Sequence, residues 1–167
     1  MPAFPEPSAE TADPAALFAR YLEFYRETVV AKTAALSVVE QRTTRMPSGW
    51  TPLELLNHLA FMERRWFVWG FLGEVLDEPW GDARDDRWHV PPERTVEDVA
   101  ALLRAVGERT AAVLASTPLD TVGADSGRFD DDPPSLAWIC FHVLQEYARH
   151  AGHLDIAVEL AGGPTGE

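Results

Sequence analysis

The chain has one cysteine, few basic residues and no long apolar run. A single cysteine, Cys140, cannot form an internal disulfide, so no disulfide framework is expected. Without a run of about 18 apolar residues, no transmembrane helix is predicted. The first residues are acidic and rich in proline and alanine, and they lack the basic start and apolar centre of a secretory signal. These absences favour a cytoplasmic protein.

Basic residues are outnumbered, because 14 lysines and arginines stand against 27 acids and give a formal net charge of −13. Nucleic acids are bound through a basic face that neutralises phosphates. We therefore expect no nucleic-acid partner and, for the same reason, no anionic membrane surface. Acids gather from Glu74 to Asp86 and from Asp125 to Asp132, and we interpret both groups as solvated loop charge.

Helical periodicity dominates the chain, and no strand-like alternation of useful length is present. Helix starts are predicted at Asp13-Pro14, at the capping box from Thr51 to Glu54, at Thr95 and near Ser135. The four predicted helices cover about residues 13–36, 51–73, 95–116 and 135–161. This pattern predicts an all-α protein, a four-helix bundle with long loops after the second and third helices. Residues 1–12 are expected to form a disordered tail, and residues 13–163 a single domain.

Two histidines and one carboxylate are the candidate metal ligands. Glu146 and His150 are four residues apart in the last predicted helix, so they lie one turn apart on one face. His58 lies on the apolar stripe of the second predicted helix. Two imidazoles and a carboxylate leave a coordination position open for water or substrate. The alternative is a hydrogen-bonded core histidine at His58 and a chance spacing of the other two.

Two further histidines, His142 and His153, lie on the shoulder of the same helical face as Glu146. Either could contact a ligand or replace one, and the alternative is a partly exposed polar edge. Cys140 has apolar neighbours, which favours a small core residue over a nucleophile. No catalytic residue is assigned from the sequence.

Four further stretches are distinctive: Pro47-Ser-Gly-Trp-Thr-Pro-Leu-Glu-Leu-Leu-Asn-His58, Glu63-Arg-Arg-Trp-Phe67, Ser135-Leu-Ala-Trp138 and Gln145-Glu-Tyr-Ala-Arg-His-Ala-Gly-His-Leu-Asp155. With them, the chain resembles the DinB/YfiT-like metalloenzyme superfamily over about residues 15–163. The chain is most similar to the branch called mini-circle proteins, a domain of unknown function related to mycothiol transferases and to mycothiol-dependent maleylpyruvate isomerases.

This resemblance implies a DinB-like four-helix bundle in which His58, Glu146 and His150 hold a metal ion. Many DinB-like proteins have a histidine at the position of Glu146, whereas the isomerase branch has the same His, Glu, His set as this chain. After the last ligand many relatives have Arg-Gly-Gln, and this chain has Ala151-Gly152-His153. His153 therefore takes the place of a polar residue near the site.

The resemblance also implies chemistry. We expect a divalent metal, with zinc favoured and nickel or iron as alternatives, and a low-molecular-weight thiol such as mycothiol as cosubstrate. The thiol would attack a small electrophile beneath the loop that carries Trp80 and Trp88, with Arg149 and His153 as candidate cofactor-binding residues that orient a carboxylate. The alternatives are metal-assisted hydrolysis, oxygen activation at a 2-His-1-carboxylate iron, and a non-enzymatic metal-binding or dimerising module. The family also suggests a homodimer, although no exposed helix face requires one.

Overall fold

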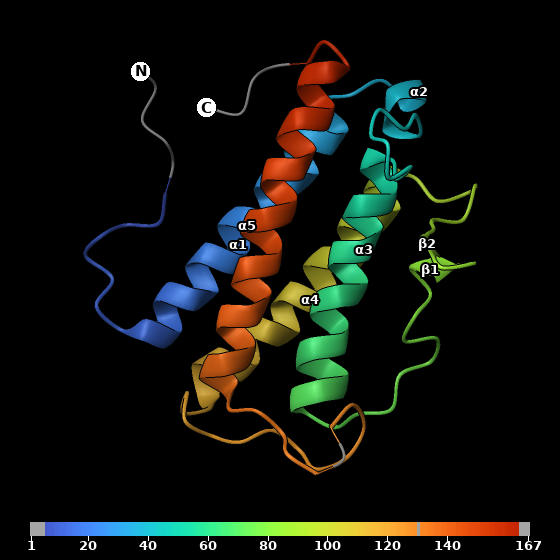
Figure 1. Cartoon of the computed structure of the whole chain (residues 1–167). Coiled ribbons are helices and arrows are strands. Elements are labelled where there is room, and N and C mark those ends of the chain that lie inside the picture. Colours follow the sequence, from blue (N-terminus) through green and yellow to red (C-terminus); the bar gives the residue numbers. More distant parts are fainter. Residues whose placement is uncertain (1–5, 130, 164–167) are drawn as a thin grey trace.

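Four long helices pack side by side in the computed structural model, which describes residues 6–129 and 131–163 (Figure 1). They are α1 (Pro14–Ala34), α3 (Pro52–Arg64) with its continuation η1 (Arg65–Phe71), α4 (Val96–Ser116) and α5 (Leu136–Leu160). A short helix, α2 (Val38–Gln41), precedes α3, and the two-residue strands β1 (Ala83–Arg84) and β2 (Arg87–Trp88) pair in the loop after η1. The predicted all-α bundle is confirmed.

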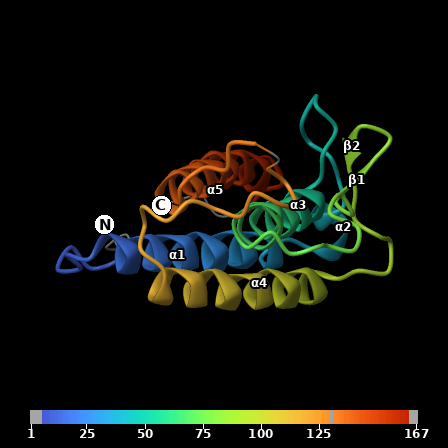
Figure 2. The ribbon, with the colours of Figure 1, turned by 90° about the horizontal axis from the view of Figure 1, so that it is seen from below.

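The helices form two layers. Figure 2 shows α1 and α4 side by side, with α3 and α5 on one side of them, and both α1 and α4 pack against α3. In addition, α5 packs against α1 and α3. No helix in the described part of the chain has the length and hydropathy needed to cross a bilayer.

The helix starts lie at the predicted caps. Asp13 accepts a 2.8 Å hydrogen bond from the backbone nitrogen of Ala16, and full capping boxes join Thr51 to Glu54 and Thr95 to Asp98. Such caps satisfy backbone N–H groups that the first turn of a helix leaves free, and each contributes about 1 kcal/mol. The caps explain why the starts of these helices could be predicted from the sequence.

The second predicted helix changes its winding at Arg65. Residues 65–71 form a π-helix, in which the backbone nitrogen of Leu72 bonds to the carbonyl of Phe67, five residues back. A Cβ at Gly70 would lie 2.8 Å from the ring of Phe129, so the glycine lets this ring pack against the wider turn. Helical periodicity alone did not indicate this change. Wide turns of this kind often occur at functional sites.

A fully buried carboxylate, Glu63, ties the four helices together. It accepts hydrogen bonds from Arg26 on α1 (2.9 and 2.6 Å), from the hydroxyl of Thr110 on α4 (2.6 Å) and from the hydroxyl of Tyr147 on α5 (2.6 Å). Arg26 is 2% exposed, so both charges are removed from water and must neutralise each other. This network fixes how the helices are rotated about their axes.

Candidate metal centre

His58, Glu146 and His150 come together between α3 and α5. Each offers a ligating atom, and the three atoms lie within 4.8 Å of one another. Nε2 of His150 lies 3.1 Å from Oε2 of Glu146. The rings of His58 and His150 pack edge-to-face, with 5.3 Å between their centroids. The side chains of His58 and Glu146 are 16% and 19% exposed, so the group is not sealed from solvent.

The ring of His58 is held by a loop carboxylate that the sequence analysis did not identify. Oδ2 of Asp82 lies 2.9 Å from Nδ1 of His58, and Arg65 donates to both oxygens of Asp82, at 2.5 and 2.9 Å. Asp82 is 1% exposed, so the interpretation of the acids at 74–86 as solvated charge is wrong for this residue. Among so many loop acids, no local pattern marks the one that is buried.

The carboxyl of Asp82 is ionised in this setting. Burial acts to raise its pKa, but hydrogen bonds from His58 and Arg65, together with their charges, bring the pKa below its ordinary value. An ionised carboxylate can only accept hydrogen bonds, so the proton of a neutral His58 lies on Nδ1. The lone pair of Nε2 is then free for a ligand, and metal-binding histidines are commonly held in this way.

The two ring nitrogens of His150 face different partners. Its Nε2 is turned to Glu146, and its Nδ1 lies 3.4 Å from Nδ1 of His153. Burial, followed by the charge of His58, lowers the pKa of His150 to about 4 despite the opposing effect of Glu146. His150 is therefore neutral at physiological pH, and the neutral imidazole is the form that binds metal ions.

His142 lies at the other oxygen of Glu146. Its Nε2 is 3.8 Å from Oε1 of Glu146. Its ring stacks on that of Trp138, with 5.4 Å between the ring centroids, and the centroid of the Trp66 ring is 4.0 Å away. Burial lowers the pKa of His142, and Arg128 adds to this effect, although Glu146 opposes it. His142 is thus a neutral neighbour of the candidate ligand Glu146.

A cavity of about 440 Å³ opens beside His150. Its lining is formed by Ser48, Gly49, Trp50, Glu54, Asp86, Arg87, Trp88, Arg149, His150 and His153. The loop after η1 forms part of the cavity wall through Asp86, Arg87 and Trp88. The ring of Trp88 also stacks on that of His58, with 4.4 Å between the ring centroids. Trp80 does not line the cavity, because its ring packs on the guanidinium of Arg65 at 4.4 Å. Of the two predicted loop tryptophans, Trp88 alone reaches this cavity.

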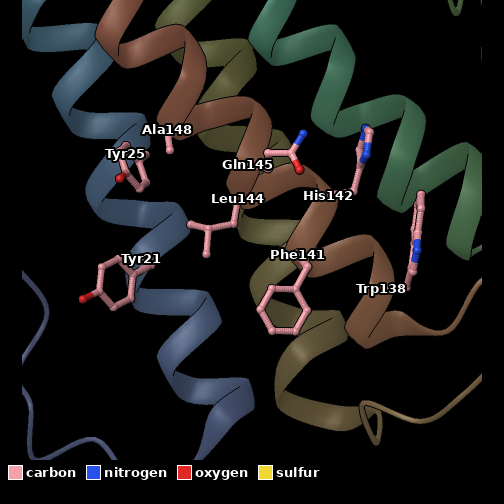
Figure 3. A pocket seen from close by; sticks show the side chains of 8 residues that line it. All are labelled: Tyr21, Tyr25, Trp138, Phe141, His142, Leu144, Gln145 and Ala148. Atoms are coloured by element: carbon pink, nitrogen blue, oxygen red, sulfur yellow. The ribbon is translucent and has the colours of Figure 1, made fainter.

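A second hollow, of about 490 Å³, lies over the outer face of α5 (Figure 3). Tyr21 and Tyr25 of α1 line one end, and Trp138 and His142 lie at the other, where both rings contact Trp66 of η1. Its lining is mainly aromatic and includes none of the three converging side chains. Of the two hollows, the cavity beside His150 is therefore the one that adjoins the candidate metal ligands.

Comparison with known proteins identifies one family for this chain. The sequence model of the mycothiol-S-transferase family matches residues 17–163, a range that contains all three converging side chains and the loop with Asp82. A search among curated proteins finds no match.

Proposed function

The chain belongs to the mycothiol-S-transferase family, and we propose that it is a metal-dependent S-transferase that joins a low-molecular-weight thiol such as mycothiol to a small electrophile. The observation that carries this proposal is the convergence of His58, Glu146 and His150 beside a cavity of about 440 Å³. Cavities of about 300–1,000 Å³ are typical of sites for small molecules. We assign the reaction to the cytoplasm, where thiols are kept reduced.

The residues fit a divalent metal. Two imidazole nitrogens and one carboxylate oxygen are ligands that suit zinc, and three protein ligands leave a position open. Nδ1 of His58 is held by Asp82, so this ring can present Nε2, and Nε2 of His150 already faces the third candidate ligand, Glu146. We favour zinc, with nickel and iron as alternatives. Such an ion, when bound, acts as a Lewis acid that stabilises the thiolate form of a thiol.

The surrounding residues would hold the two substrates. Trp50 and Trp88 provide apolar walls, and Arg149 and His153 would orient a carboxylate of the thiol or of the electrophile. Arg149 is exposed and has no ion-pair partner among the described residues, so its guanidinium is available. In a substitution, the thiol proton passes to solvent, a carbon–sulfur bond forms and the bond to the leaving group breaks.

Metal-assisted hydrolysis is the second candidate, because the partial exposure of His58 and Glu146 also admits water. A single assay separates the two. Metal-loaded protein is given epoxides, activated aryl halides and cis-unsaturated acids, with and without mycothiol. Metal content is measured beforehand by elemental analysis.

We expect turnover that needs both metal and mycothiol and that is lost in His150→Ala and in chelated protein. The matched control is Glu159→Gln, an exposed change on the same helix, which should leave turnover unchanged. Turnover with metal and water alone would reassign the protein as a hydrolase. No turnover with metal fully bound would favour a non-enzymatic metal-binding module.

A further inference from the structure

We propose that Asp82 is a positioning residue that couples metal binding to the order of the loop that walls the cavity. The inference rests on the metal centre of the proposed function. It concerns the loop between η1 and α4, residues 72–95, which lies alongside α3 in Figure 1.

The Asp82 carboxylate is held by three hydrogen-bond contacts with two residues. Arg65 donates to both of its oxygens, at 2.5 and 2.9 Å, and His58 lies 2.9 Å from Oδ2. Arg65 also donates to the carbonyl of Pro79 at 2.9 Å, which ties the preceding part of the loop to the same guanidinium. Asp82 and Arg65 are 1% and 4% exposed. Water therefore does not compete for these bonds, and the carboxylate cannot turn without breaking them.

The same loop contacts the turn of α3 that carries His58 at two further points. The side-chain amide of Asn57, next to His58 in sequence, donates to the carbonyl of His89 at 2.8 Å. The backbone nitrogen of His89 in turn donates to the carbonyl of Asp82 at 2.7 Å. The ring of Trp88 stacks on His58 with an interplanar angle of 17°. The segment from Asp82 to His89 therefore moves with the ring of His58.

This connection works in both directions. A metal ion that fixes the ring of His58 also favours the loop conformation that Asp82 and Trp88 require, and an ordered loop favours metal binding by the same factor. Asp86, Arg87 and Trp88 line the cavity. Metal binding therefore shapes the wall that faces the substrates, although these three residues are not metal ligands.

The test compares Asp82→Asn with Asp85→Asn. Asp85 is exposed on the same hairpin, has a φ of 51° that asparagine tolerates, and does not line the cavity. Zinc affinity is measured by competition with a chromophoric chelator, and hydrogen exchange of residues 72–95 is followed with and without zinc. We expect Asp82→Asn to weaken zinc binding about 10–100-fold. We also expect zinc to protect the loop in the wild type and in Asp85→Asn, but not in Asp82→Asn.

Wild-type zinc affinity in Asp82→Asn, or equal zinc-induced protection of its loop, would overturn the proposal. Glu146→Gln distinguishes this failure from failure of the metal centre. If Glu146→Gln loses zinc and Asp82→Asn keeps it, the coupling alone is wrong. If the wild type binds no zinc, or Glu146→Gln binds it equally well, both are wrong.

Asp82→Asn leaves the buried Arg65 without its counter-charge, so folding is checked by circular dichroism on metal-free protein. If the variant does not fold, nitrogen NMR of the His58 ring in the wild type decides instead. We expect the proton on Nδ1 and metal coordination through Nε2. A proton on Nε2, with coordination through Nδ1, would overturn the proposal.

Discussion

The hydroxyl of Tyr147 donates a 2.6 Å hydrogen bond to Glu63, while the carboxylate of the preceding residue, Glu146, faces His150. Tyr147 is fully buried, and Glu146 lies on the partly exposed side of α5. Because neighbouring residues on a helix point about 100° apart, anchoring Tyr147 in the core sets the direction of Glu146. The buried network of Glu63 thereby supports the geometry of the candidate metal centre.

Removing the charge of Glu63 should destabilise the protein strongly. In Glu63→Gln the guanidinium of Arg26 stays buried without a counter-charge, and we expect the free energy of unfolding to fall by about 3–5 kcal/mol. Urea denaturation measures the change. The control is Arg104→Gln, which removes a half-exposed ion pair with Glu27 and should cost at most about 1 kcal/mol. A loss in Glu63→Gln no greater than that of the control would contradict the role given to the network.

Tyr147→Phe tests the hydroxyl alone. It leaves Glu63 with its bonds to Arg26 and Thr110, so we expect a smaller loss, about 1–3 kcal/mol, by the same denaturation method. If the network also sets the direction of Glu146, zinc affinity should fall in this variant although no candidate ligand is changed. An unchanged zinc affinity would limit the role of Tyr147 to stability.

Glu146→Gln should weaken metal binding more than it disturbs the fold. The amide keeps the shape of the side chain but loses the charge of the candidate oxygen ligand. Equilibrium dialysis against zinc should show a lower affinity than in the wild type and in the control Glu159→Gln. Equal affinities in all three proteins would mean that Glu146 does not bind the metal, and a collapse of helicity would mean that its role is structural.

The stability of the metal-free protein should fall between about pH 6.5 and pH 4. The pKa of His150 is lowered from 6.5 to about 4 in the folded state. In this window the unfolded chain binds the proton and the folded chain does not, so the free energy of unfolding decreases as the pH falls. Above pH 6.5 His150 is neutral in both the folded and the unfolded state, so it no longer makes the free energy of unfolding depend on pH.

Thermal unfolding across this pH range, with His150→Gln as the comparison, measures the contribution of His150. We expect a shallower pH dependence in the variant. The lowered pKa of His142 acts in the same direction and should leave a residual slope. Identical pH profiles in the two proteins would show that His150 is not kept neutral by the fold.

The chain should not bind DNA or RNA at physiological salt. Its net charge of −13 repels phosphates, and each bound phosphate would need a cationic partner. Fluorescence anisotropy with a labelled random duplex should show no binding. Binding that weakens as salt is added would contradict this expectation.

The sequence by itself determined the helices and pointed to the candidate ligands. Capping boxes such as Thr51 with Glu54 involve residues three apart, and the spacing of Glu146 and His150 needs only one turn of helix. These are local relationships, so the helix geometry alone places the residues. The apolar stripe of the second predicted helix pointed to His58, and the resemblance implied the same set of three. The role of each as a ligand stays a prediction.

Only the tertiary structure decided which charges are buried and with which partners. Asp82 is one of several loop acids, and it differs from them because the loop folds back onto His58 and Arg65, 24 and 17 residues away. Glu63 forms hydrogen bonds with Arg26 and Tyr147, which are 37 and 84 residues away in the sequence. Whether a carboxylate is solvated or buried in an ion pair depends on what the packing of distant segments brings against it. The residues next to a carboxylate in the sequence therefore do not predict whether it is buried.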